Sequence, residues 1–217
     1  MRLHFMESYK YIVIEGNIGS GKTSLSKRMA NALDSKLVLE TFSDNPFLPK
    51  FYKDQKRYAF PLELSFLAER YHQLKEELNS YDLFKKIIVS DYYFSKSLLF
   101  AKITLPEDEF VLYQKLFNII YSSLPKPDLY IFLYTDISRL LNNIQHRGRS
   151  YEQDIKPEYL EQIRNEYVNF LNNQTDFPVL LIDNSNIDFV KNEDDFLKIK
   201  TQLNKPWSKG VHIVTID

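Results

Sequence analysis

The sequence of 217 residues contains no cysteine, and none of its apolar runs approaches the ~18 residues that a membrane-spanning helix needs. The absence of cysteine excludes disulfide bonds and thiolate metal sites, and it agrees with the reducing environment of the cytoplasm. Residues 1–7 also lack the apolar core of a signal peptide. We therefore expect a cytoplasmic protein with no membrane partner.

An excess of charge of either sign is missing too. The 28 Lys and Arg residues balance the 29 Asp and Glu residues, for a formal net charge of −1. Proteins that bind nucleic acid non-specifically carry a basic face, so we expect no nucleic-acid partner. The chain is long enough to bury one core, and we expect a single domain over residues 1–217.

Glycine is scarce, but three of the five glycines fall in the stretch Gly16-Asn17-Ile18-Gly19-Ser20-Gly21-Lys22-Thr23. This stretch fits the phosphate-loop pattern G-x-x-x-x-G-K-[ST], in which backbone N–H groups and a helix N-terminus surround an anion. An apolar β-branched run precedes it, and an amphipathic stripe of Leu25, Met29 and Leu33 follows it. Lys22 would contact the β- and γ-phosphates, and the Thr23 hydroxyl would ligate Mg²⁺. The sequence thus predicts a site for a nucleoside triphosphate.

Short apolar runs alternate with longer amphipathic stretches, which predicts an α/β fold with a parallel sheet. The runs are continuously apolar, as in strands that are covered on both faces. The predicted strands are 11–14, 37–39, 87–89, 129–134 and 179–182, and the predicted helices are 22–33, 47–56, 61–79, 94–104, 107–122, 136–146, 157–172 and 192–203. Residues 211–216 alternate like an edge strand, to which we assign no function.

Acidic residues follow two of the predicted strands, and ligands of parallel sheets bind at the carboxyl ends of strands. Glu40 follows the second strand and could take the proton from an attacking hydroxyl. A solvated acid at a strand end is an equally good interpretation. Asp91 follows the third strand, where phosphate-loop enzymes often place a ligand of the Mg²⁺ site.

Glu63, Phe66 and Arg70 share one face of the helix predicted at 61–79. A carboxylate, an aromatic ring and a guanidinium arranged in a row along the helix could hold a planar polar ligand, or they could form an ordinary solvated face. Farther along, Arg147-Gly148-Arg149 lies on a loop between two predicted helices. Two mobile arginines there could stabilise the charge on a transferring phosphoryl group, although a basic surface turn is the simpler alternative.

Taken together, these residues make the sequence resemble the bacterial and animal deoxynucleoside kinases. The resemblance runs from Tyr11 to about Leu203 and rests on Glu15–Thr23, Asp44-Asn45-Pro46-Phe47-Leu48, Phe66–Arg70, Pro127-Asp128-Leu129, Arg147-Gly148-Arg149 with Glu152, and Tyr159-Leu160. It implies a five-stranded parallel sheet flanked by helices, a helical lid at about 146–155, and a homodimer. It also implies ATP and Mg²⁺ as cofactors, and transfer of the ATP γ-phosphate to the 5′-hydroxyl of a deoxynucleoside in nucleotide salvage.

The resemblance assigns roles around the acceptor. Glu40 matches the general base, and Arg70 matches the arginine that lies beside that carboxylate and the substrate. Tyr52 and Glu152 match the pair that grips the sugar 3′-hydroxyl, and Asp91 matches the acidic position of the family's Glu/Asp-Arg-Ser motif.

Around the donor, Lys22 belongs to the phosphate loop, and Arg147 and Arg149 match the lid arginines on the donor phosphates. Asp188-Phe189 matches the segment that borders the donor base.

The sequence departs from the family pattern at four positions. Tyr92 replaces the arginine of the Glu/Asp-Arg-Ser motif, so one positive charge near the phosphates is missing. Asn143 replaces another lid arginine, and Ser97 replaces the acidic partner near the base. Glu63 replaces the glutamine that reads the base. A carboxylate only accepts hydrogen bonds, which suits the two adjacent donors of guanine and favours deoxyguanosine or another purine, unless a nearby arginine neutralises Glu63.

Two other functions are compatible with the same features. A nucleoside monophosphate kinase of the thymidylate kinase type shares the fold, but it would need more cations for the acceptor's phosphate. A nucleotide-binding regulatory subunit with weakened catalysis would account for the missing arginines, although Lys22, Glu40 and the lid residues remain.

Overall fold

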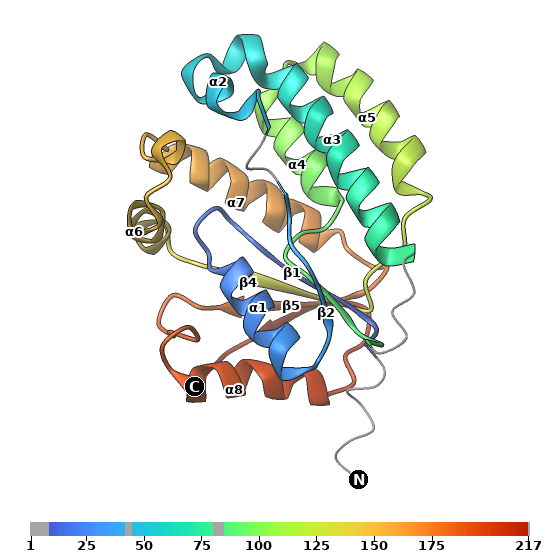
Figure 1. The fold of residues 1–217 in the computed structure, drawn as a ribbon, viewed down its shortest axis with the longest axis vertical. Helices are drawn as coiled ribbons and strands as arrows, with labels where there is room; N and C mark the ends of the chain where they lie inside the picture. The colour runs from blue at the N-terminus through green and yellow to red at the C-terminus, as the bar shows by residue number, and fades with distance from the viewer. Residues whose placement is uncertain (1–8, 42–44, 80–84, 217) are drawn as a thin grey trace.

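The computed structural model describes residues 9–41, 45–79 and 85–216. Its centre is a sheet of six parallel strands in the order β2-β3-β1-β4-β5-β6 (Figure 1). The strands are β1 Tyr11–Gly16, β2 Lys36–Val38, β3 Ile88–Ser90, β4 Leu129–Tyr134, β5 Pro178–Asp183 and β6 Gly210–Val214. The predicted α/β class is confirmed. Asp44, which contributes to the family resemblance, lies outside the described residues.

The sheet has one strand more than the family resemblance implies. Residues 210–214 form β6, which pairs with β5 in parallel from Pro178↔Gly210 to Ile182↔Val214. The alternation in 211–216 did predict an edge strand. Val214 turns toward the core at 7% exposure, whereas Ile213 is 81% exposed, because one side of this edge strand faces solvent.

Within the described ranges, eight α-helices surround the sheet, close to their predicted positions: α1 Lys22–Ala32, α2 Leu48–Lys53, α3 Gln55–Asn79, α4 Ser95–Thr104, α5 Glu107–Tyr121, α6 Ile137–Arg147, α7 Pro157–Asn172 and α8 Glu193–Thr201. Only α3 departs clearly, because it begins six residues before Pro61. Asp54 Oδ1 accepts a hydrogen bond from Arg57 N–H, so an N-cap precedes the proline by two turns. None of the helices in the described ranges is both long and apolar enough to cross a membrane.

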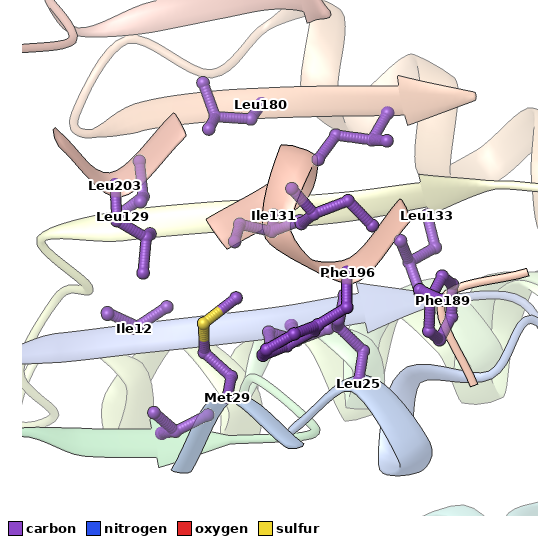
Figure 2. Close-up of a cluster of buried hydrophobic side chains, with 14 of the residues drawn as sticks. Ile12, Leu25, Met29, Leu129, Ile131, Leu133, Leu180, Phe189, Phe196 and Leu203 are labelled. Carbon is purple, nitrogen blue, oxygen red and sulfur yellow. The ribbon is translucent and has the colours of Figure 1, made fainter. Parts of the chain in front are cut away.

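Helices bury both faces of the central strands of the sheet. On one face α1 and α8 cover β1, β4 and β5, and Leu25, Met29 and Phe196 pack onto alternate strand residues such as Ile12 and Ile131 (Figure 2). The other face is covered by α4 and α7, while α3 and α5 pack outside α4 (Figure 1). This arrangement explains the continuously apolar strands, and it leaves the carboxyl ends of β1, β2 and β3 free to build a site.

Candidate active site

The phosphate loop connects β1 to α1, and its shape depends on glycine. Gly21 is the N-cap of α1 with φ 90° and ψ 8°, a left-handed conformation that glycine adopts without strain. A Cβ atom at Gly16 would lie 2.5 Å from Ser20 Oγ and 2.9 Å from the Leu133 carbonyl oxygen. The glycines of the motif therefore allow a close turn that no other residue would fit.

The side-chain amides of three asparagines fix this loop by hydrogen bonds. Asn17 Nδ2 donates to the Leu160 carbonyl at 2.7 Å, and its Oδ1 accepts from Ile18 N–H at 2.8 Å. Asn143 Nδ2 donates to the Gly19 carbonyl at 2.8 Å, and Asn184 Nδ2 donates to the Ser20 carbonyl at 3.1 Å. Asn143, at the position of a missing lid arginine, thus supports the loop. Asn17 is 3% exposed, and its side chain fixes the loop through its hydrogen bonds to Leu160 and Ile18.

Three predicted residues meet where β1, β2 and β3 end. Thr23 Oγ1 donates to Asp91 Oδ2 at 2.5 Å, and the Glu40 backbone N–H donates to Asp91 Oδ1 at 2.7 Å. Asp91 therefore joins the phosphate loop to the candidate base. A hydroxyl and a carboxylate at the mouth of a phosphate loop are oxygen ligands of the kind that Mg²⁺ prefers.

Glu40 is a buried carboxylate held by two cations. Its Oε1 accepts a hydrogen bond from Arg70 Nε at 2.9 Å and forms an ion pair with Arg70 Nη2 at 2.7 Å, and its Oε2 accepts from Lys96 Nζ at 2.5 Å. Burial raises the pKa of Glu40, but the charges of Lys96 and Arg70 outweigh it and lower the pKa to about 2. The interpretation as a solvated strand-end acid is therefore wrong.

The face of α3 that carries Glu63, Phe66 and Arg70 is also buried, with exposures of 2%, 8% and 4%. The Arg70 guanidinium lies 4.7 Å from the centre of the Phe66 ring and donates to Ser97 Oγ at 2.9 Å. Glu63 Oε1 accepts from the Thr104 hydroxyl at 3.0 Å, whereas its buried Oε2 has no partner among the described residues. Burial raises the pKa of Glu63 to about 7. The alternative that this face of α3 is simply exposed to solvent is therefore excluded.

The lid residues converge on the same place. Glu152 is 5% exposed and pairs with Arg147, and its Oε1 accepts from Arg149 Nη1 at 3.2 Å. The Tyr151 ring stacks on the Tyr52 ring of α2 at 6.0 Å, so the lid rests on the other side of the cleft. The expected lid comprises the end of α6, the left-handed Gly148 and a short 3-10 turn at Ser150–Glu152.

Two cavities open at this edge of the sheet. The first, with about 770 Å³ of empty space including its mouth, is lined by Glu40, Tyr52, Glu63 and the other residues assigned to the acceptor. The second runs along the phosphate loop from Gly19 to Ser24 and reaches Asp188 and Phe189. Lys22, Thr23, Arg147 and Arg149 line both cavities. A donor in one cavity and an acceptor in the other would meet at these four residues.

Asp188 and Phe189 line the second cavity, but both also support its wall. Asp188 Oδ1 accepts hydrogen bonds from the N–H groups of Val190 and Lys191. The Phe189 ring is 3% exposed and lies 2.9 Å from where a Cβ of Gly21 would be. Gly16 and Asn17 line neither cavity, whereas Ile18 lines the first.

Some residues of the first cavity escaped the sequence analysis. Lys96 is the most important, because it contacts Glu40 directly. The signal in the sequence was a lysine in the first turn of the helix that follows Asp91. Phe100, four residues later on the same helix face, and Tyr159 on α7 complete the walls. Aromatic and aliphatic wall residues look like ordinary core in a sequence.

Comparisons with known proteins agree with this geometry. The family model for deoxynucleoside kinase matches residues 12–207. Deoxyguanosine kinase of Bacillus subtilis (strain 168) is 32% identical over 204 residues, 92% of this chain and 99% of that protein. Deoxyadenosine/deoxycytidine kinase of the same strain is 30% identical over 210 residues, 94% of this chain and 95% of that protein.

Solved structures point to the same group. The structure of deoxyadenosine kinase from M. mycoides with bound dATP matches with a TM-score of 0.78 at 25% identity, covering 91% of this chain and 100% of that one. Phosphate loop, acceptor cleft, sequence relatives and structural relatives all agree. The chain therefore belongs to the deoxynucleoside kinase family, whose members are ATP-dependent phosphotransferases acting on deoxynucleosides.

Proposed function

We propose that the protein phosphorylates the 5′-hydroxyl of a purine deoxynucleoside, with deoxyguanosine preferred, and that it does so in nucleotide salvage in the cytoplasm. The observation that carries the base preference is the free carboxylate oxygen of Glu63 in the acceptor cavity. Oε2 is buried without a partner among the described residues, whereas Oε1 already accepts from Thr104. A buried acceptor without a donor costs about 1–3 kcal/mol, and a suitable ligand would remove that cost.

Guanine fits this acceptor better than the other bases. Its N1–H and 2-amino group are adjacent donors, and both could bond to the ionised Glu63. Adenine and cytosine present a donor beside an acceptor, so they pair with a carboxyl group only when it is protonated. The relatives include a deoxyguanosine kinase and a deoxyadenosine/deoxycytidine kinase at similar identity, so the proposed base preference rests on Glu63 alone.

In the proposed mechanism the phosphate-loop amides and Lys22 hold the donor phosphates. Thr23 and Asp91 would hold Mg²⁺, and the contact of their oxygens at the mouth of the loop fits that ion. When bound, Mg²⁺ supplies positive charge to the donor oxygens. Tyr52 and Glu152 would bind the sugar 3′-hydroxyl, and Phe66 would pack against the base.

Glu40 would accept the proton of the 5′-hydroxyl, with Arg70 fixing its orientation. Because its pKa is about 2, Glu40 is ionised at neutral pH and free to accept a proton, although it is a weak base. The loose transition state of phosphoryl transfer needs little help from a strong base and depends mainly on positive charge around the phosphoryl group. Arg147 and Arg149 would provide that charge as the lid closes.

We also propose that one domain, residues 1–217, carries the whole site and that two copies form a homodimer. The support for the dimer is a stripe on the outer side of α5. Leu112, Leu116 and Ile119, spaced four and three residues apart, are 51%, 38% and 73% exposed, and Val111 beside them is 41% exposed. Exposed apolar patches of this kind often mark interfaces.

Steady-state phosphorylation of the four natural deoxynucleosides with ATP and Mg²⁺ tests the function. We expect deoxyguanosine to have the highest kcat/KM, Glu63→Gln to shift preference toward deoxyadenosine or deoxycytidine by about 10²-fold, and Glu40→Gln to lower kcat by about 10²-fold or more. Glu76→Gln is the matched control, because Glu76 lies on the same helix with a side chain 66% exposed. Turnover of deoxynucleoside monophosphates alone, or nucleotide binding without any turnover, would contradict the proposal.

A further inference from the structure

Lys96 occupies an unusual place for a lysine. It lies in the first turn of α4, its side chain is 8% exposed, and its ammonium contacts Glu40 Oε2 at 2.5 Å. It lines the acceptor cavity together with Lys22 and Thr23, at the junction with the donor cavity. A buried lysine beside a buried glutamate is usually a structural ion pair, so the surroundings of the pair decide its role.

Glu40 does not need a second cation for charge balance. Arg70 already neutralises it, because Nε donates a hydrogen bond to Oε1 and Nη2 forms an ion pair with the same oxygen. The guanidinium is in turn fixed by Ser97 and by the Phe66 ring. Arg70, Glu40 and Lys96 together carry one positive charge in excess. In the described part of the chain, the nearby carboxyl groups of Glu15 and Glu63 act on Lys96 through space, without a hydrogen bond to it. An anion that enters the cavity could form a direct ion pair with Lys96 that these two carboxyl groups do not form.

The position of Lys96 also fits a cation that moves. Glu40 is the one side chain to which Lys96 donates a hydrogen bond within the described ranges, whereas Arg70 is held on several sides. Rotation of the lysine side chain would therefore break a single hydrogen bond. Lys22 and Lys96 both line the acceptor cavity, so a phosphoryl group that passes from the phosphate loop to a hydroxyl beside Glu40 enters a space lined by both ammonium groups.

Tyr92, which begins the short segment that leads to Lys96, does not provide a positive charge to the acceptor cavity. Tyr92 stands where the family pattern has an arginine, and its hydroxyl donates to Gln73 Oε1 at 2.9 Å. Tyr92 is fully buried and does not line the acceptor cavity. The cavity nevertheless contains an ammonium four residues farther along the chain.

We infer that Lys96 is a catalytic cation that leaves Glu40 Oε2 when the acceptor binds and contacts the equatorial oxygens of the transferring phosphoryl group. The inference rests on the proposed role of Glu40 as base. In the step, the 5′-hydroxyl proton goes to Glu40, and the O5′–phosphorus bond forms. The bond from phosphorus to the bridging oxygen breaks, and ADP leaves with the electron pair. Lys96 stays protonated throughout.

The test is Lys96→Ala, with added ethylammonium as a small cation that can enter the space left by the side chain. We expect kcat to fall by about 10²-fold, the KM for the deoxynucleoside to change little, and ethylammonium to restore turnover in a concentration-dependent way. Lys96→Arg should retain more activity than Lys96→Ala. Lys102→Met is the matched control, because Lys102 lies on the same helix, pairs with Glu166 and is 50% exposed.

A purely structural lysine would give a different result. If Lys96→Ala keeps native kcat, or if ethylammonium restores thermal stability but not turnover, the inference is wrong. The Glu40→Gln variant separates it from the proposed function. Loss of turnover in Glu40→Gln together with native turnover in Lys96→Ala overturns only the role of Lys96, whereas full turnover in Glu40→Gln overturns the base itself.

Discussion

Glu63 is a side chain whose charge can change near neutral pH. Burial raises its pKa to about 7, while Arg70, the Thr104 hydroxyl and Lys96 act in the opposite direction and Glu40 adds to the rise. The protonated carboxyl group donates one hydrogen bond and accepts others, much as an amide does, whereas the ionised group only accepts. The cavity therefore presents two hydrogen-bonding patterns according to pH.

We predict that base preference depends on pH. As pH rises from about 6 to about 8, Glu63 loses its proton, so the ratio of kcat/KM for deoxyguanosine to that for deoxyadenosine should rise. In Glu63→Gln the ratio should stay flat, because an amide does not titrate in this range. Initial rates with both substrates across the pH range measure the ratio, and an equal slope in native protein and variant would disprove the role of Glu63.

Single residues differ in how well the sequence revealed them. Spacing alone put Glu63, Phe66 and Arg70 on one helix face, because the helical repeat is fixed by geometry. It could not tell whether that face was buried, since burial depends on α4 and α5 packing over it. Lys96 was missed for a related reason. Its partner Glu40 is 56 residues away, and no local pattern marks such a contact.

Among the structural elements, the phosphate loop and the lid helix are in direct contact. Gly19 has φ 83°, and a Cβ added to it would lie 2.8 Å from the Leu140 carbonyl oxygen in α6. Asn143, one turn later in α6, donates to the Gly19 carbonyl. The position of α6, and with it that of Arg147 at its end, therefore depends on the loop.

We expect Gly19→Ala to weaken ATP binding by at least about tenfold, because the new methyl group pushes α6 and the loop apart, on top of about 1–2 kcal/mol for the left-handed backbone. Gly210→Ala separates the two effects. Gly210 has φ 103° with nothing within 4 Å of an added Cβ, so it should lose stability but retain ATP affinity. Calorimetric titration and denaturant unfolding measure the two quantities, and equal ATP affinity in both variants would refute the prediction.

Element positions followed well from the sequence where local signals are strong. The five predicted apolar runs correspond to β1 to β5, and the phosphate-loop motif correctly predicted that α1 begins at Lys22. The start of α3 did not follow, because Pro61 is typical of a first turn and here lies inside the helix. The pairing of β6 with β5 is a long-range contact, which alternation in 211–216 suggests but does not specify.

For the whole molecule, we predict that the native protein sediments as a dimer of 25.8 kDa chains and that Leu112→Glu sediments as a monomer. A carboxylate placed in an apolar interface would be buried without a partner. Ile213→Glu is the control, because Ile213 is 81% exposed on the edge strand β6, away from α5. Sedimentation equilibrium distinguishes the states, and a native monomer would rule out the homodimer.

The strand order also has a consequence for synthesis on the ribosome. β1 leaves the ribosome before the other described strands of the sheet but lies in the middle of it, between β3 and β4. The phosphate loop that follows β1 is held by Asn143, by the Leu160 carbonyl and by Asn184. A nascent chain therefore carries the complete phosphate-loop motif from residue 23 onward, yet it gains these contacts that shape the nucleotide site only after residue 184 has emerged, 164 residues after Ser20 of the loop.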